Sequence, residues 1–258
     1  DYMGKIIIIA SGKGGVGKTT TAAMLGTALS QRGKKVLVCD IDFGLRNLDI
    51  AFGVQDSVVY DVLDCVDGRC TLEEASIEIS DKLFFLPASQ SRRIKFVDMT
   101  KVSEYISSIS EGFDFILLDS PAGIGVTLEE CAVCADEALI VVRPYMSSVR
   151  DADRCIDVLE ENGVLEASLI INDVDNMLIN DGTMMNADRT ADLLGIPVLG
   201  IVPHDKDILS GEKLGGDGAA KKAFSNIAGR MLGEKIPIMN FDEKKDGLIK
   251  KIRLFFKK

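Results

Sequence analysis

The sequence lacks the residues that mark several common classes of protein. Its 258 residues include one histidine, His204, and no cysteine or second histidine lies near it, which argues against a histidine-based metal site. One C-x-x-C pair is present, Cys131 and Cys134, but there is no second pair to complete a cluster site. No run of about 18 uncharged apolar residues occurs, so no membrane-spanning helix is predicted.

Basic residues are also too few for a protein that binds nucleic acid through general electrostatic attraction. Lysine and arginine number 30 against 40 acidic residues, which gives a net charge of −10. The charge is unevenly distributed, because residues 244–258 carry seven basic residues and one acidic residue. We therefore expect one large domain over residues 1–243 and a distinct C-terminal segment over 244–258.

Apolar runs alternate with helical patterns along the large domain. Hydrophobic residues make up 47% of the chain. Strands are predicted at 6–10, 35–39, 83–86, 113–118, 138–142, 167–171 and 196–202. Helices are predicted at 21–29, at 58–63 with Ser57 as its cap, and at 98–110, 127–135, 147–162, 184–194, 206–213 and 219–232. Continuous apolar strands between helices predict an α/β fold, with a mainly parallel sheet covered by helices on both faces.

A glycine-rich stretch joins the first predicted strand to the first predicted helix. Residues 12–19 read GKGGVGKT and match the P-loop pattern G-x-x-x-x-G-K-[ST]. Its glycines allow backbone N–H groups to surround a phosphate, and the helix start adds partial positive charge. Lys18 should reach the β- and γ-phosphates, and the Thr19 hydroxyl should bind Mg²⁺. The expected phosphate-binding residues are Gly12, Gly14, Gly15, Val16, Gly17, Lys18, Thr19 and Thr20.

The same glycines fit a second pattern. Gly12, Gly14 and Gly17 satisfy G-x-G-x-x-G, the fingerprint of dinucleotide-binding proteins. A hydride-transferring enzyme has no use for Lys18 and Thr19 at the helix start, so the P-loop interpretation is favoured. A glycine-rich loop without a ligand is the remaining alternative.

Three aspartates follow predicted strands. Asp40 and Asp42 come after one strand, and Asp119 comes after another. Because ligands of open α/β sheets bind beyond the carboxyl ends of the strands, all three should face the glycine-rich loop. Such acids hold Mg²⁺, directly or through water, and orient the attacking water in phosphoryl transfer. Turn capping is the alternative, but three acids at strand ends favour the phosphate–metal role.

Several segments together resemble the MinD/ParA family of deviant Walker A ATPases. Residues 13–19 (KGGVGKT) resemble its phosphate loop, which carries an additional early lysine, here Lys13. Residues 40–49 (DIDFGLRNLD) and 118–123 (LDSPAG) are similar to the two switch regions of the family's MinD branch. Residues 86–90 (LPASQ) and 147–154 (SSVRDADR) also match. The resemblance covers nearly the whole chain.

The resemblance implies an ATPase that dimerises around ATP and Mg²⁺. Lys13 would reach the phosphates bound by the partner copy and act there like an arginine finger. Asp42 would position the attacking water, and Asp40 would lie near the γ-phosphate and the metal. Thr19 would bind the metal, with Asp119 just beyond the metal's ligands.

The resemblance also implies where the adenine base lies. Asn172 and the loop Val202-Pro203-His204 would frame it, so Asn172 and Pro203 are counted as cofactor-binding residues. The family often has arginine after that asparagine, whereas this chain has Asp173. Part of the base contact is therefore left open.

A family member of this kind would position the division septum. It would bind a MinC-like division inhibitor and a MinE-like activator, and it would lie in the cytoplasm at the inner face of the cell membrane. Ser148, Asp151 and Asp153 lie on the helix that resembles the family's partner-binding surface. From the residues alone, that helix face could equally be an ordinary solvated surface.

The basic C-terminal segment is amphipathic. On a helix, five of its six apolar residues fall within an arc of about 120°, Leu254 lies outside it, and lysines and arginine occupy the flanks and the opposite face. The residues in the arc are Leu248, Ile249, Ile252, Phe255 and Phe256. This pattern predicts a membrane-targeting helix on an anionic lipid surface. A helix docked on the domain, or in a partner's groove, is the alternative.

Two other functions are compatible with parts of the sequence. A ParA-like ATPase that segregates DNA or other cargo shares the loop, but the acidic body and the lipid-type segment argue against it. An iron–sulfur carrier of the same superfamily would use Cys131 and Cys134, although these cysteines also fit ordinary packing in a predicted helix.

Overall fold

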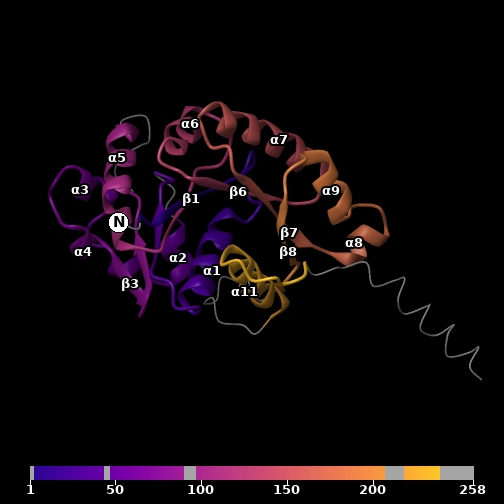
Figure 1. Ribbon diagram of the computed structural model, residues 1–258, viewed down its shortest axis with the longest axis horizontal. Helices are drawn as coiled ribbons and strands as arrows, with labels where there is room; N and C mark the ends of the chain where they lie inside the picture. The colour runs from indigo at the N-terminus through magenta and orange to yellow at the C-terminus, as the bar shows by residue number, and fades with distance from the viewer. Residues whose placement is uncertain (1–2, 44–46, 90–96, 207–217, 239–258) are drawn as a thin grey trace, which may run out of the picture.

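The chain folds into a three-layer α/β arrangement with a central sheet (Figure 1). The computed structural model describes residues 3–43, 47–89, 97–206 and 218–238. The segment 244–258 and most of the predicted helix 206–213 lie outside these ranges. Within the described ranges, no helix combines the length and hydropathy needed to cross a bilayer.

The strands form one eight-stranded sheet in the order β3-β4-β2-β5-β1-β6-β7-β8. Their bounds are Lys5–Ala10 (β1), Val36–Asp40 (β2), Ile77–Ser80 (β3), Leu83–Leu86 (β4), Phe115–Asp119 (β5), Glu137–Val142 (β6), Ala167–Val174 (β7) and Val198–Pro203 (β8). The strands run parallel except for β3, which pairs antiparallel with β4 at one edge. The predicted mainly parallel sheet is confirmed, and β3 is an addition to it.

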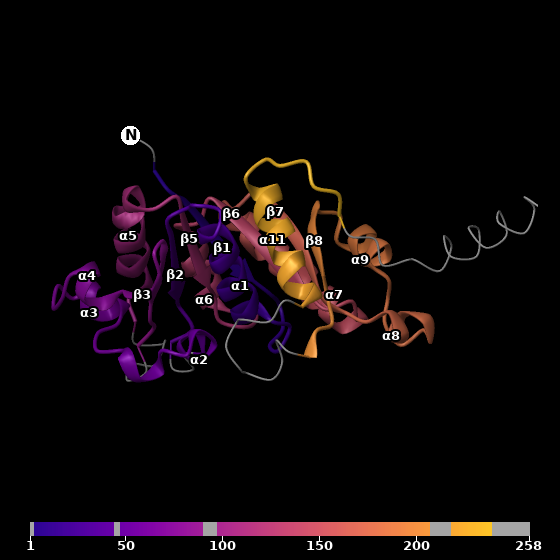
Figure 2. The ribbon, with the colours of Figure 1, turned by 90° about the horizontal axis from the view of Figure 1, so that it is seen from below.

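Helices cover both faces of the sheet, as Figures 1 and 2 show. One face packs against α1 (Lys18–Ser30), α2 (Leu48–Phe52) and α11 (Ala219–Met231). The opposite face packs against α3 (Val62–Val66), α5 (Met99–Ile109), α6 (Val126–Ala132), α7 (Met146–Glu161) and α9 (Ala187–Leu194). Two short helices, α4 (Leu72–Ala75) and α8 (Asn176–Asn180), complete the α-helices of the described ranges.

Strand β1 shows why the strands are apolar throughout. Ile6 and Ile8 belong to the core on the α5–α7 side, whereas Ile7 and Ile9 belong to the core on the α1–α11 side. Successive side chains of a strand point to opposite faces, so a strand covered on both faces has no polar side. The same strand ends at Ala10, where the glycine-rich loop begins.

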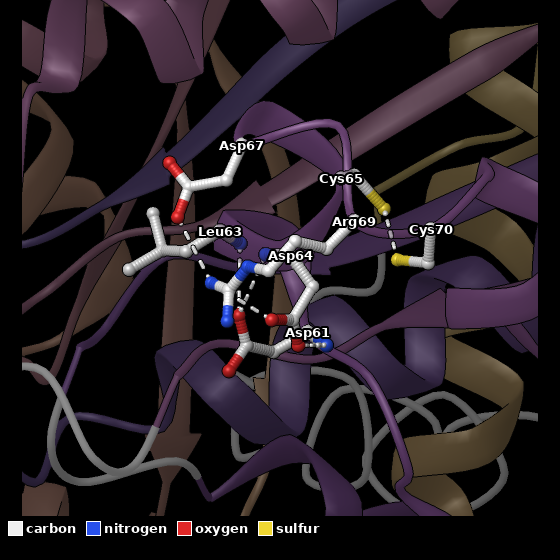
Figure 3. Close-up of polar contacts among 7 residues, drawn as sticks. All are labelled: Asp61, Leu63, Asp64, Cys65, Asp67, Arg69 and Cys70. Carbon is white, nitrogen blue, oxygen red and sulfur yellow. Dashed lines mark hydrogen bonds and ion pairs between the residues drawn. The ribbon is translucent and has the colours of Figure 1, made fainter.

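The prediction of a helix at 58–63 is wrong about the residue at which the helix begins. Ser57 ends a short 3₁₀ helix, and α3 begins only at Val62. The cap is Asp61, whose side chain accepts hydrogen bonds from the N–H groups of Leu63 (2.9 Å) and Asp64 (3.2 Å). Asp64 Oδ2 in turn accepts a hydrogen bond from the Asp61 N–H at 2.9 Å, which completes a capping box and fixes the start of the helix (Figure 3).

The turn after α3 is held by charge. Arg69 donates to Asp64 and to Asp67, each at 2.9 Å, so that one guanidinium joins the helix to the loop that follows it (Figure 3). The Sγ atoms of Cys65 and Cys70 lie 3.6 Å apart in the same turn, and both cysteines are free thiols.

Candidate functional site

The glycine-rich loop has the geometry of a phosphate cradle. Gly15 and Gly17 have φ angles of 75° and 97°, a region that residues with side chains rarely adopt. Gly12 packs against α7, because a Cβ added there would lie 1.9 Å from the carbonyl oxygen of Asp151. The loop backbone therefore takes a path that only glycine permits at these three positions, directly before α1.

The two lysines of the loop lie in different environments. Lys18 is 8% exposed, and its Nζ donates to Ser11 Oγ at 3.0 Å. Burial lowers the pKa of Lys18, and the charges of the nearby aspartates act in the opposite direction. Lys13 is exposed, and its Nζ donates to Ser147 Oγ at 3.3 Å, at the start of α7. Lys18 therefore belongs to the interior of the cradle, and Lys13 lies outside it.

The predicted acids meet at the edge of the sheet beside the loop. Asp40 and Asp119 are register partners at the ends of β2 and β5, with 0% and 2% of their surfaces exposed. Asp40 Oδ1 accepts a hydrogen bond from the Asp42 N–H at 2.9 Å. The structure thus brings together three acids that are up to 79 positions apart in the sequence, as the strand-end argument predicted.

Burial shifts the acid pKa values upward. Burial, and then the charge of Asp119, raise the pKa of Asp40 to about 8. Burial raises the pKa of Asp119 to about 6, although the Thr19 hydroxyl and the Lys18 charge both lower it. Burial also raises the pKa of Asp42, with Lys18 opposing the shift. These carboxylates are therefore crowded in a setting with too little positive charge.

The donor set fits a Mg²⁺ ion. Asp119 Oδ1 is buried, and within the described residues it has no hydrogen-bond partner. The hydroxyl of Thr19 lies close enough to Asp119 to lower its pKa by hydrogen bonding. Mg²⁺ prefers oxygen ligands and is usually held by one or two carboxylates together with substrate phosphates. A bound cation would offset both the crowding of Asp40 against Asp119 and the unpaired oxygen.

The raised pKa of Asp40 predicts a loss of stability at higher pH. The folded protein without ligand holds a proton that the unfolded chain releases near pH 4, so its unfolding free energy should fall as the pH rises from about 4 to about 8. Each pKa unit corresponds to about 1.4 kcal/mol. Urea unfolding at several pH values should show a weaker pH dependence for Asp40→Asn than for the wild type. The prediction would be contradicted if the unfolding free energies of the two proteins changed with pH in parallel.

A hollow of about 240 Å³ continues from the loop toward β7 and β8. It is lined by the loop, by Thr20, Asn172, Pro203 and His204, and by Arg143, among others. Asn172 Nδ2 donates to the Val16 carbonyl at 2.8 Å, so the predicted base-framing residue also supports the loop. Arg143 was not predicted, although a basic residue directly after an apolar strand is a recognisable signal.

Helix α7 carries the predicted partner residues, but one of them is misassigned. Ser148 is only 5% exposed, and its Oγ accepts a hydrogen bond from the Arg143 N–H at 3.3 Å. A side chain that satisfies the backbone beneath its own helix cannot form part of a docking surface. Asp153 is exposed, and Asp151 is half-buried with its backbone against Gly12. Of the three, only the two aspartates reach the surface.

The C-x-x-C cysteines pack in the core on the α5–α7 side. Cys131 is 1% exposed, and Cys134 Sγ lies 3.6 Å from the Cys131 carbonyl oxygen. Across the ranges that the structure describes, no group of three or more histidine, cysteine or acidic side chains is placed to hold a metal ion. The predicted membrane residues, Leu248, Ile249, Ile252, Phe255 and Phe256, lie outside those ranges.

Comparison with known proteins gives a consistent result. Residues 4–162 match the AAA domain family. The chain is 39% identical over 264 residues to the septum site-determining protein MinD of Bacillus subtilis, with 98% of each chain covered. The structure matches MinD in a MinC:MinD cell division protein complex from Aquifex aeolicus with a TM-score of 0.83, 38% identity and coverage of 92% and 98%. It also matches MinD of Pyrococcus horikoshii complexed with Mg-ADP, with a TM-score of 0.78, 29% identity and coverage of 91% and 100%.

Proposed function

The chain belongs to the MinD family of septum site-determining ATPases, and we propose that it is an ATP-dependent, dimerising membrane ATPase that positions the division septum. The observation that carries the ATPase proposal is the convergence of Lys18, Thr19, Asp40 and Asp119 around one cradle. A relative of known structure is complexed with Mg-ADP, which supports Mg²⁺ and an adenine nucleotide as the ligands of this site.

The roles of the side chains follow from their positions. The loop N–H groups and Lys18 would hold the phosphates, and Thr19, Asp40 and Asp119 would hold Mg²⁺, directly or through water. The metal would supply positive charge to the phosphate oxygens. Asp42, half-buried beside Asp40, would orient a water molecule toward the γ-phosphorus. The water oxygen would bond to phosphorus as the bond to the β–γ bridging oxygen breaks and the water gives up one proton, which yields ADP, phosphate and a proton.

Dimerisation would complete the site. Lys13 is exposed and its amine lies outside its own cradle, at the start of α7, so it is free to serve the cradle of a second copy. A lysine amine brought to the transferring phosphate adds charge where the transition state needs it. Hydrolysis would then require two copies with ATP between them.

Helix α7 would connect the nucleotide site to the surface that binds partner proteins. It contacts the loop at two points, through Asp151 against Gly12 and through Ser147 with Lys13, and it exposes Asp153. A MinC-like inhibitor would bind this helix, since a relative forms a MinC:MinD complex. A MinE-like activator would stimulate hydrolysis and release the protein from the membrane, to which residues 244–258 would attach it.

The replacement of Lys18 by alanine tests the site itself. Removing the buried ammonium deletes charge-assisted hydrogen bonds to phosphate, so the Kd for ATP should rise about 100-fold. Calorimetric titration with ATP and Mg²⁺ measures this change. Lys101→Ala on α5, a substitution of an exposed lysine far from the cradle in sequence and on another helix, is the matched control and should bind normally. Unchanged ATP affinity in Lys18→Ala would refute the assignment of the cradle.

A further inference from the structure

The end of β7 is irregular where it reaches the hollow. Ile171 pairs with Ile201 and Val174 pairs with Pro203, so three steps along β7 correspond to two along β8. The extra residue makes a bulge at Asn172 and Asp173. Asp173 has a φ of 60°, and among the described residues it is the only one with a side chain in that region. Bulges of this kind often redirect side chains beside functional sites.

The two side chains of the bulge contact different parts of the hollow's lining. Asn172 holds the glycine-rich loop through Val16, as described above. Asp173 forms an ion pair with Arg143 through Oδ2, and its Oδ1 lies 2.6 Å from His204 Nδ1. All three members of this cluster, Arg143, Asp173 and His204, line the hollow. One local irregularity therefore supports both the glycine-rich loop and the cluster of Arg143, Asp173 and His204.

Arg143 has donor capacity left over. Its Nε is buried, and no hydrogen-bond partner for it exists within the described residues. A guanidinium carries five N–H donors in a fixed plane, and a buried donor without a partner costs about 1–3 kcal/mol. Both oxygens of Asp173 are already engaged by Arg143 and His204, so the carboxylate has little acceptor capacity to offer. The Arg143 side chain is also 37% exposed and lines the hollow, so the hollow is complementary to a ligand that brings hydrogen-bond acceptors.

We infer that Arg143, held in place by Asp173, contacts the base and ribose of the bound nucleotide, and that Asp173 is a positioning residue that fixes Arg143 and His204. This inference rests on the proposed nucleotide site and adds the residues that contact the base and ribose.

The test separates the base end from the phosphate end. Calorimetric titrations with Mg²⁺ would compare ADP with pyrophosphate, which lacks base and ribose. Arg143→Ala should raise the Kd for ADP about tenfold and leave the Kd for pyrophosphate unchanged. Asp173→Asn should raise the Kd for ADP about threefold, because the neutral amide cannot form an ion pair with the guanidinium of Arg143. Arg143→Lys should fall between the wild type and Arg143→Ala, since lysine keeps the charge but loses the planar fork.

A matched control comes from the same strand. Glu137, at the start of β6, forms an ion pair with Lys5 at the start of β1, and these strand starts lie opposite the strand ends that face the hollow. Glu137→Gln should therefore change neither Kd. In ATPase assays, Arg143→Ala should raise KM and leave kcat nearly unchanged. Unchanged ADP affinity, or an equal loss of pyrophosphate affinity, would overturn the inference. Failure of the wild type to bind either probe would instead overturn the proposed function.

Discussion

Lys13→Ala should bind ATP with nearly wild-type affinity yet lose at least about 1,000-fold in dimer-dependent hydrolysis, the smaller end of the effect of an arginine finger. The reason is its location. Its amine lies outside its own cradle, whereas Lys18 lies within, so removing Lys13 leaves the local phosphate contacts in place. Calorimetry and a phosphate-release assay with activator and lipid would measure the two quantities separately.

Mixing two inactive variants tests whether Lys13 acts across the dimer. Asp42→Asn retains Lys13 but lacks the proposed water-orienting carboxylate. In a mixed dimer, one site combines Asp42 of the Lys13→Ala copy with Lys13 of the Asp42→Asn copy. An equal mixture should regain up to about a quarter of the wild-type rate, because half of the dimers are mixed and one of their two sites is complete. Full stimulated turnover in Lys13→Ala alone, or no recovery on mixing, would contradict the cross-dimer role.

Membrane attachment should depend on the nucleotide. Two amphipathic segments on one dimer gain about 10²–10⁴ in avidity over one, so sedimentation with anionic liposomes should be strong with ATP or a slowly hydrolysed analogue and weak with ADP. Ile252 lies within the apolar arc, and Ile252→Glu should abolish binding, because each copy loses a buried apolar side chain worth about 1.5–3 kcal/mol. Equal binding in all three nucleotide conditions would rule out the switch.

Leu254 offers a matched control in the same segment. It falls outside the apolar arc, so Leu254→Glu has the same added charge and nearly the same size change but should keep most of the liposome binding. Both variants should hydrolyse ATP at the basal rate, because neither lies in the proposed site. Equal losses in the two variants would show that charge, rather than an oriented apolar face, governs attachment. A DNA pulldown with ATP at several salt concentrations would test the segregation alternative.

The structure changed the interpretation of residues whose roles depend on distant neighbours. Ser148 reads as a surface residue from its position in a polar helix, yet it is buried and bonds to the Arg143 backbone. Ser57 reads as a helix cap, but the reciprocal pair of Asp61 and Asp64 competes successfully a few residues later. In both cases the local sequence pattern was compatible with the prediction, but a more favourable set of hydrogen bonds determined where the side chain lies or where the helix begins.

By itself, the sequence determined the parallel strands of the sheet, the cradle and the acids at its rim. Strand periodicity and glycine conformations are properties of a few consecutive residues, so the apolar runs and GKGGVGKT could be interpreted without a fold. Only the tertiary structure decided that Gly12 packs against Asp151, that burial raises the pKa of Asp40, and that a bulge brings Asp173 to Arg143. These features arise between segments far apart in the chain, where packing and desolvation, rather than local preference, set the energy.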